Sequence, residues 1–538
     1  MKKKIVSIFL CKLMLVAALI SVVVTGSINY TADQSPPDIE WDKTFGGDKI
    51  DWGCYVQQTY DGGYIISGAI DRNPYTPWKG FGYLLKIDSS GNKEWDQKFF
   101  VETCWDVVAQ SVQQTDDNGD GIKNDGYIIV GYTGFTWQYD LYLVKTDING
   151  KVLWTRIIGL YDAFDRGVSV QQTTDGGYII TGNTQSYGSG GGDVWLLKFD
   201  SNGYEEWNKT FGGVYRDYGF CVQQTSDGGY IITGDTESFG VDGDIYLIKT
   251  DPSGNEEWNK TFGGNKWDNS HSVQQTTDNG YIITGWYTTI AGDRDIYLIK
   301  TDSSGNEEWS KTYGGNYDDV SYSVQQTAYG GYFITGFSCT DPIYCNPDVY
   351  LIKTDSSGNE EWSETLNKTK NNEGYCGKQT KDGGYIISGY TGSNYSNGSI
   401  DIWIIKLEGH NQEPDVPRVD GPSNVKVKRK TEYSIVTNDP NNDIVSYFVD
   451  WGDGEIEDWT DFSESGKEIF LEHTWKKQGT YLIKVKAKDP YNAESDWYEI
   501  DLEVAKSTNC AQSLIQRLLD SFPNVFQVLR ALLILFGR

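Results

Sequence analysis

Residues 258–309 are WNKTFGGNKWDNSHSVQQTTDNGYIITGWYTTIAGDRDIYLIKTDSSGNEEW, and most of the chain repeats this stretch. It holds four alternating or apolar runs of strand length, separated by turns rich in Gly, Asn and Asp. The stretch therefore predicts a unit of four short strands. Seven such units follow one another along the chain.

Three residues mark the phase of the repeat: a Trp, the Tyr that opens the second strand, and the Lys that closes the third. The Trp spacing settles at 51–53 residues in the middle of the chain, which is a typical length for a propeller blade. The marks are Trp41, Trp95, Trp154, Trp207, Trp258, Trp309 and Trp362; Tyr64, Tyr127, Tyr178, Tyr230, Tyr281, Tyr332 and Tyr385; and Lys86, Lys145, Lys198, Lys249, Lys300, Lys353 and Lys406.

The two ends of the repeat complement each other. The chain enters at Glu40–Phe45 with a fourth strand that lacks the three before it. It leaves at 401–410 with a third strand that lacks the fourth. Pairing the first segment with the last unit would close a ring and remove two open sheet edges. The prediction is an all-β fold, with a seven-bladed β-propeller over residues 37–410 whose N-terminal strand completes the last blade.

The repeat SVQQTxDGGYIITG…DxYLIKTDxxGNxxW, from Ile39 to Leu407, resembles the repeats of secreted archaeal and bacterial β-propeller proteins. The resemblance implies the fold and leaves the activity open, because propellers carry many functions.

After a Pro-rich linker, residues 414–505 change character. VDWGDG at 449–454 and HTWKKQGTYLIKVKAKD at 473–489 resemble the PKD domain, an immunoglobulin-like β-sandwich of extracellular proteins. That resemblance implies a spacer or adhesive module. The strand-like runs there are 432–436, 444–450, 468–473 and 481–486.

Composition limits the partners. Acidic residues number 76 against 46 basic ones, and the formal net charge of −30 disfavours binding to nucleic acid. An aromatic content of 14% indicates that this acidic chain is folded rather than disordered.

Both termini indicate an envelope location. Lys2, Lys3 and Lys4 precede an apolar run, so residues 1–26 are expected to be a signal peptide, with an uncleaved anchor as the alternative. The tail, 507–538, has apolar residues at helical spacing and a Pro523 bend. We expect an amphipathic helical tail that lies at the membrane surface or envelope, or one that docks onto the protein. The predicted location is secreted or cell-surface.

Aromatic residues collect in the variable connections, where recognition usually occurs. Beside Asn and Asp they suit stacking on sugars, so an extracellular glycan or protein ligand is expected, although the rings could equally pack between blades. The candidates are Trp52, Trp267, Trp286, Tyr287 and Trp137. Asp and Gln residues that recur in nearly every unit are interpreted as scaffold, because catalysis needs one site rather than several.

One turn departs from the repeat: residues 116–125 replace the usual DGG. Their closely spaced oxygens resemble the calcium hairpins of integrin-type propellers, with Asn124 where the last Asp would stand. The predicted ligands are Asp116, Asn118, Asp120, Asn124 and Asp125, with a solvated acidic turn as the alternative. Calcium is the one cofactor expected.

Cys339 and Cys345 flank TDPIY within one loop, and we expect them to form a local disulfide in an oxidising exterior. No nucleophile–base pair, HExxH motif or P-loop stands out, so the predicted role is non-catalytic. The alternatives are an extracellular carbohydrate-active enzyme on the same scaffold and a purely structural envelope component.

Overall fold

The computed structural model describes residues 35–506 except 73–79, 103, 105, 120, 136–137, 161–162, 342–344, 395–398, 410 and 442. All regular elements within these limits are strands, which agrees with the predicted all-β class. The expected signal peptide (1–26) and helical tail (507–538) lie outside the described residues. In the described part of the chain, no helix has the length and apolar character needed to cross a membrane.

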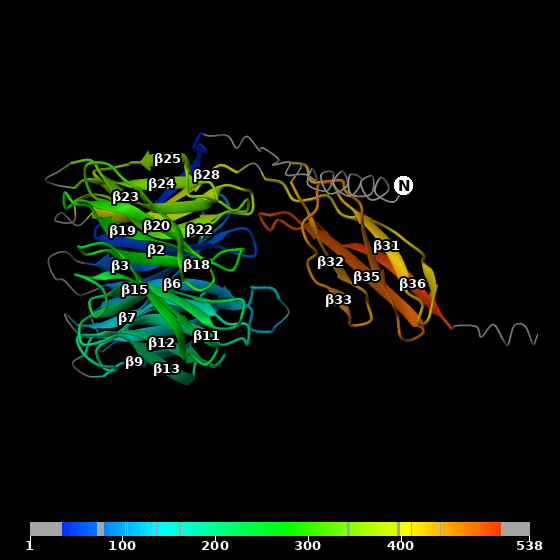
Figure 1. Ribbon diagram of the computed structural model, residues 1–538, viewed down its shortest axis with the longest axis horizontal. Helices are drawn as coiled ribbons and strands as arrows, with labels where there is room; N and C mark the ends of the chain where they lie inside the picture. The colour runs from blue at the N-terminus through cyan, green and yellow to red at the C-terminus, as the bar shows by residue number, and fades with distance from the viewer. Residues whose placement is uncertain are drawn as a thin grey trace, which may run out of the picture. The chain divides into compact units, whose positions relative to one another are not determined.

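Strands β2–β28 form seven repeated units (Figure 1). Unit 1 contains β2 (Ile50–Gln58), β3 (Tyr64–Arg72), β4 (Phe81–Ile87) and β5 (Lys93–Phe99); unit 2 contains β6 (Asp106–Thr115), β7 (Gly126–Phe135), β8 (Gln138–Asp147) and β9 (Val152–Ile158); unit 3 contains β10 (Arg166–Gln172), β11 (Tyr178–Thr184), β12 (Asp193–Phe199) and β13 (Glu205–Phe211); unit 4 contains β14 (Asp217–Gln224), β15 (Tyr230–Thr236), β16 (Asp244–Thr250) and β17 (Glu256–Phe262).

The later units repeat the plan. Unit 5 contains β18 (Asn269–Gln275), β19 (Tyr281–Thr288), β20 (Arg294–Thr301) and β21 (Glu307–Tyr313); unit 6 contains β22 (Asp319–Gln326), β23 (Tyr332–Cys339), β24 (Pro347–Thr354) and β25 (Glu360–Leu366); unit 7 contains β26 (Asn371–Gln379), β27 (Tyr385–Asn394) and β28 (Ser399–Leu407). In each unit the strands pair antiparallel in chain order. Second and third strands are buried along most of their length and read as continuous apolar runs, whereas fourth strands keep one polar, exposed face.

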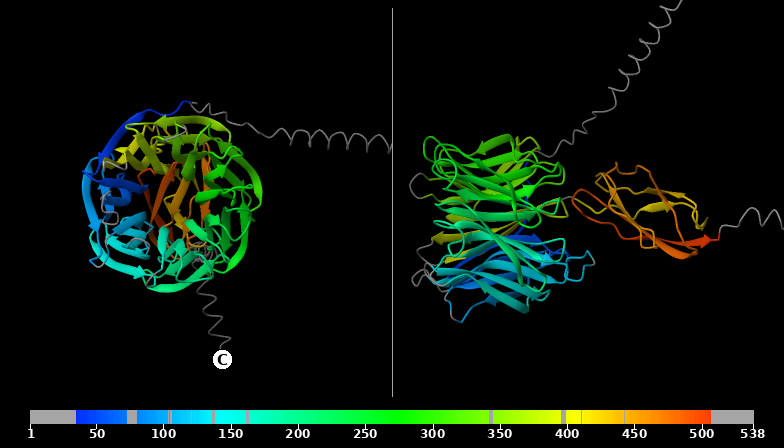
Figure 2. Two further views of the ribbon diagram at one scale, coloured as in Figure 1. Left: turned by 90° about the vertical axis from the view of Figure 1, so that its left-hand side faces the viewer. Right: turned by 60° about the horizontal axis from the view of Figure 1, so that its bottom comes forward.

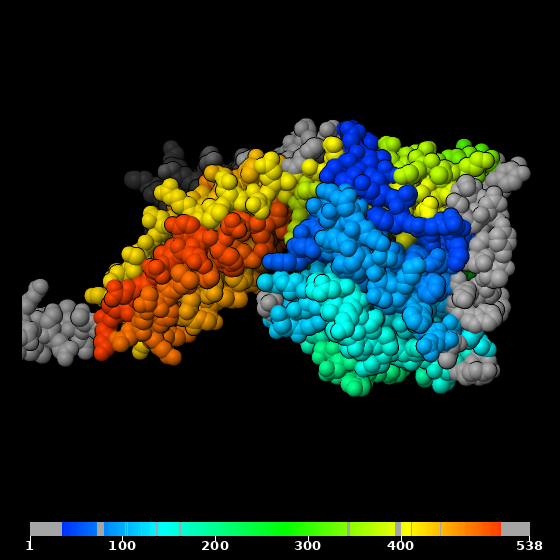
Figure 3. Space-filling view, turned by 180° about the vertical axis from the view of Figure 1, so that it is seen from behind, coloured from blue at the N-terminus to red at the C-terminus, as the bar shows by residue number. Residues whose placement is uncertain are grey.

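The N-terminal strand β1 (Ile39–Phe45) supplies the fourth strand of unit 7. It pairs antiparallel with β28, with Trp41 opposite Lys406 and Thr44 opposite Trp403. Figure 3 shows these N-terminal residues in blue beside the yellow and green of the last units. Glu40 of β1 forms an ion pair with the Lys406 ammonium at 3.1 Å. The predicted pairing of residues 40–45 with the last unit is confirmed.

Contacts between units form closed cycles. In the left view of Figure 2 the sheets follow one another around a common centre, and each unit's first strand contacts the first strands of its two neighbours, β26 and β2 included. Each marker Trp packs on the Tyr of the next unit at 5.9–6.1 Å between ring centroids, and Trp41 on Tyr64 completes the set of seven. The last unit is therefore held to the first as each unit is held to the next.

The marker lysines stabilise the interior of each unit. Lys249, for example, is buried and pairs with Asp227 of the tight turn and Glu257 of the fourth strand, at 2.9 and 3.0 Å. A buried ammonium needs such partners, because an unpaired charge is costly to desolvate. The repeated Lys, Asp and Glu residues thus have a scaffold role.

Residues 418–505 form two further sheets around a separate core. One sheet has β29 (Arg418–Asp420), β31 (Thr431–Val436) and β34 (Ile469–His473); the other has β30 (Asn424–Lys426), β36 (Tyr498–Ala505), β35 (Gly479–Lys488), β32 (Ser446–Asp450) and β33 (Ile456–Glu457), in that order. Trp451, Trp475 and Tyr433 fill the space between the sheets, and the Trp475 indole donates to the Trp451 carbonyl at 3.2 Å. The four predicted strand runs are confirmed, with ends that differ by one to two residues.

Candidate functional site

A cavity of about 540 Å³ is enclosed by the first strands of all seven units. Its size lies within the range of small-molecule sites. Side chains from β2, β6, β10, β14, β18, β22 and β26 line it, together with Tyr132 of β7. No single unit builds the site, so it exists only when the units are assembled.

A β-bulge in every first strand directs one residue into this cavity. The register with the second strand shifts at the same repeat position in all seven units, for example between Gly219 and Cys221. A bulge inserts an unpaired residue and re-aims its side chain. The seven inserted residues all line the cavity: Cys54, Gln110, Val168, Phe220, His271, Tyr322 and Tyr375.

The inserted residues divide the cavity wall into two halves. Those of units 4 to 7 form a continuous aromatic arc, with ring centroids 5.3, 4.9 and 5.0 Å apart; its members are Phe220, His271, Tyr322 and Tyr375. Units 1 to 3 contribute the smaller or polar side chains of Cys54, Gln110 and Val168. One wall is therefore lined by aromatic rings that are tilted 50–70° to one another, and the inserted residues of the facing wall are smaller or polar.

Half-buried Glu373 fixes one end of the arc. Its carboxylate accepts hydrogen bonds from the hydroxyls of Tyr390, at 2.7 Å, and Tyr322, at 3.5 Å. Burial raises the pKa of Glu373. Because its oxygens are engaged by these hydroxyls, Glu373 orients the arc rather than lining the cavity.

Lys378 is the one cavity-lining residue that is charged at neutral pH. Burial lowers the pKa of His271 to about 4, raises that of the Cys54 thiol to about 12, and raises that of Cys221, so all three are neutral. The Lys378 ammonium lies 5.5 Å from the centroid of the Tyr55 ring, a cation–π contact with unit 1.

Lys378 also interrupts a cycle of hydrogen bonds between units. In units 1 to 6 the first Gln of the QQ pair accepts a bond from the backbone N–H of the next unit's second Gln, at 2.5–2.9 Å. Lys378 occupies this position in unit 7 and has no acceptor atom. The second Gln residues complete their own cycle of seven, which the Lys381 N–H to Gln58 bond closes.

The aromatic residues that the sequence nominates are not brought together. Trp52 lines the cavity beneath the Arg72 guanidinium, at 4.7 Å, and also packs between units 1 and 2. Trp286 stacks with Arg294 at 4.7 Å and packs against Phe337 of unit 6. Trp267 is 42% exposed, Tyr287 packs on Tyr297, and Trp137 lies outside the described residues. Trp52 and Trp267 thus keep solvent-facing or cavity-facing surface.

The predicted calcium loop is held by its own backbone. Asp116 accepts from the N–H groups of Gly119 and Gly121, at 2.7 and 2.8 Å, and Asp125 accepts from those of Asp117 and Asn118. The Asn124 N–H donates to the Ile122 carbonyl, and Asp120 lies outside the described residues. A cation bound here would exchange some of these bonds for ion contacts.

Other predicted residues can be placed directly. A disulfide joins Cys339 and Cys345. The recurrent Asp before each first strand receives a backbone N–H from the preceding connection, as Asp217 does from Gly213 at 2.8 Å and Asp268 from Gly264 at 2.6 Å. These carboxylates are turn acceptors, in agreement with their scaffold interpretation.

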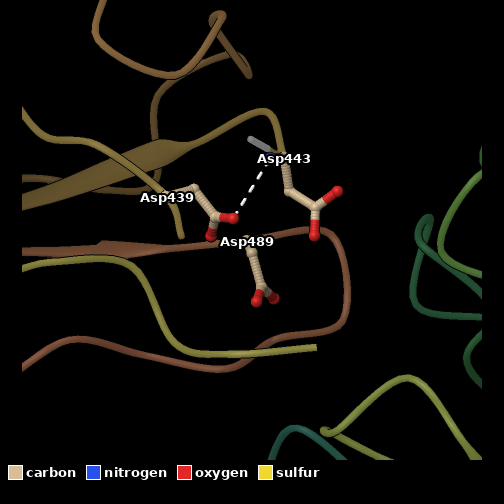
Figure 4. Close-up of side chains that lie close together, drawn as sticks. All are labelled: Asp439, Asp443 and Asp489. Atoms are coloured by element: carbon tan, nitrogen blue, oxygen red, sulfur yellow. Dashed lines mark hydrogen bonds between the residues drawn. The ribbon is translucent and has the colours of Figure 1, made fainter. Parts of the chain in front are cut away.

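A second group of polar residues lies in the loops that follow β31, precede β32 and follow β35 (Figure 4). Asp439, Asp443 and Asp489 are buried, and one oxygen of each lies within 4.8 Å of the others. Asp439 Oδ1 accepts the Asp443 N–H at 3.1 Å, while its Oδ2 is buried without a hydrogen bond. Burial raises the pKa of Asp439, and raises that of Asp489 to about 6. Three carboxylates at this spacing could hold a divalent cation.

The comparison with known families settles the nature of this second body. A family model described as the PKD domain matches residues 411–511. Residues 411–511 are a PKD domain. The DWGDG segment of the PKD domain places Asp450 as an acceptor for the Gly452 N–H, and Asp453 against His473 at 3.0 Å.

A solved PKD domain matches the C-terminal part of this chain, whereas the match over most of the chain has low identity and a low TM-score. The PKD domain of an M14-like peptidase from Thermoplasmatales archaeon SCGC AB-540-F20 is 42% identical over 18% of this chain and 99% of its own, with a TM-score of 0.18. A bifunctional GH43-CE protein of Bacteroides eggerthii covers 84% of this chain and 64% of its own at 11% identity, with a TM-score of 0.25. No curated protein matches the chain.

Sequence reasoning identified Trp52 but missed the other residues that build the cavity, and it missed the acidic group of the PKD domain. The available signal was a break in the repeat: CGKQT in unit 7 stands where other units have SVQQT, CVQQT or YVQQT. The arc residues gave no comparable signal, since a bulge is not visible in a period-two pattern.

Proposed function

We propose that residues 37–410 form a seven-bladed β-propeller, and that the chain is a non-catalytic, secreted or cell-surface protein. In this proposal the propeller binds an extracellular glycan or protein, and the PKD domain serves as a spacer. PKD domains are typical of extracellular proteins, which supports an exterior location.

One observation carries the architecture: the Trp–Tyr contacts form a cycle that includes both ends of the repeat. Trp41 of β1 packs on Tyr64 at 6.0 Å, and Trp362 packs on Tyr385 at 5.9 Å. An open array of repeats would leave its terminal units exposed and would need capping units. The cavity enclosed by the first strands then supports ligand binding as the role of the ring.

The binding role can be tested with the mature full-length chain on glycan and extracellular-protein arrays, alongside a panel of glycosidase and esterase substrates. We expect a specific ligand and no turnover. Trp52→Ala, in the cavity, and Trp267→Ala, on the exposed surface, test the two positions, and loss of a Trp that the ligand covers should weaken binding about tenfold or more. Trp497→Ala is the matched control, because Trp497 lies in the PKD domain and is also 42% exposed.

Each other outcome selects a different role. Turnover of a sugar substrate would identify a carbohydrate-active enzyme and would refute the non-catalytic assignment. Folded protein that binds nothing on either array would favour a structural envelope component.

A further inference from the structure

The cavity contains one charged group, the Lys378 ammonium, whose contacts there are a hydrogen bond and a cation–π contact with Tyr55. The residues that line the cavity include no carboxylate, and no described carboxylate oxygen lies within 4.0 Å of this nitrogen. The marker lysines, such as Lys249 and Lys406, differ from Lys378 because each has an acidic partner. Lys378 is half-buried, and a partly desolvated charge without a counterion is less favourable than one in water.

Lys378, which stands where the other units have Gln, also removes a hydrogen bond between unit 7 and unit 1. Gln325 of unit 6 accepts the Gln379 N–H at 2.8 Å, whereas Lys378 cannot accept the corresponding bond from unit 1. Replacing an acceptor by a cation therefore gives up a bond between units and gains a positive charge inside the cavity. The position has a use that the other six Gln residues do not share.

The other side chains that line the cavity indicate which uncharged groups an anionic ligand would carry. The arc of Phe220, His271, Tyr322 and Tyr375 offers aromatic rings, tilted 50–70° to one another, and an aromatic ring of this kind packs against the C–H face of a sugar. Gln110 and Ser111 on the facing wall offer amide and hydroxyl groups of the kind that bond to hydroxyls. A polyanion would be repelled by a protein of net charge −30, so a single carboxylate fits best.

We propose that this cavity binds an acidic sugar, a uronate whose carboxylate pairs with the Lys378 ammonium and whose pyranose ring lies against the aromatic arc. The inference rests on the binding role proposed above and names the ligand class and the site. It assigns Lys378 as the residue that selects acid over neutral sugar.

The test uses galacturonate, glucuronate and mannuronate, each beside its neutral methyl ester, titrated against the full-length protein by calorimetry. We expect at least one uronate to bind more tightly than its ester by roughly ten- to a hundredfold, the usual gain from a charge-assisted bond. In Lys378→Gln, which restores the residue of the other six units, this preference should fall to within about twofold, with the ester affinity unchanged.

Two controls keep the result interpretable. Lys381→Gln removes an exposed ammonium of the same unit that does not line the cavity, and should leave the preference intact. Lys378→Met serves as a second variant without charge, and the melting temperature of each variant reports its folding. Phe220→Ala should weaken the uronate and the ester alike.

The two proposals can fail separately. A preference that survives in folded Lys378→Gln, or three uronates that bind no better than their esters, overturns the uronate site even if an array ligand is found. Array-negative wild-type protein, by contrast, removes the binding role itself.

Discussion

Asp235 is a buried carboxylate whose chemistry depends on its protonation. Its side chain is 4% exposed, and its Oδ1 has no hydrogen bond. Burial raises its pKa to about 7, and the nearby carboxylates of Glu237 and Asp217 act in the same direction. Unit 3 has Asn183 at the same repeat position, opposite Arg166 as Asp235 is opposite Tyr218. The site therefore tolerates a neutral amide.

This residue makes stability depend on pH. A folded-state pKa of about 7, against 3.8 when unfolded, means that Asp235 contributes fully below about pH 4 and loses its contribution as the pH rises through 7. We expect Asp235→Asn to be more stable than wild type at pH 8, by about 2–4 kcal/mol, and within about 1 kcal/mol of it at pH 4.5. Urea unfolding at both pH values measures this.

An exposed acidic residue provides the comparison for Asp235. Asp496→Asn, on the PKD surface, should shift neither value. Equal stability of Asp235→Asn and wild type at pH 8 would show that Asp235 is ionised at little cost.

At the scale of elements, β1 behaves as an integral strand although it is separated from its partner by most of the repeat. Glu40 and Trp41 make the same contacts as Glu206 and Trp207 within unit 3, one with the marker Lys and the other with the next unit's Tyr. Because the contacts match, removing either Trp should cost the same.

Trp41→Ala and Trp207→Ala should each destabilise the protein by about 3–5 kcal/mol, the usual cost of deleting a packed indole. Chemical denaturation of both variants under one condition gives the comparison. A small effect at Trp41 beside a large one at Trp207 would mean that the seam is open in solution and that the closed ring is wrong.

The 116–125 loop is the element to which calcium is assigned, and we keep that assignment as a proposal. Millimolar calcium is expected to raise the melting temperature by a few degrees, with reversal by EDTA, because an ion that binds only the folded state stabilises it by mass action. Asp116→Asn should abolish the response. Asp175→Asn, in the ordinary turn of unit 3, should lower stability yet leave the response in place.

The acidic group of the PKD domain offers a competing location for the same ion. If the calcium response persists in Asp116→Asn and disappears in Asp443→Asn, the ion belongs to the PKD domain and the loop is a solvated acidic turn.

For the whole molecule, the sequence was most informative where a pattern repeats. The positions of the marker Trp, Tyr and Lys residues predicted the strands, the incomplete terminal units and the pairing of residues 40–45 with β28. They were informative because each marker residue makes the same contact in every unit. The repeat pattern did not identify the residues that the bulges direct into the cavity. Their direction depends on a bulge between Gly53 and Tyr55 and its six equivalents, and a bulge arises from pairing between strands rather than from composition.

The pairing of β1 with β28 also has a kinetic consequence. The Asp42 carboxylate accepts a hydrogen bond from the Trp403 indole 361 residues later, so the first strand to leave the ribosome is the last to find its neighbour. Contacts this distant in the chain make folding slow, and an unmatched strand edge invites aggregation while it waits. Folding of these units once residue 407 has been synthesised suits such a chain better than unit-by-unit folding during synthesis.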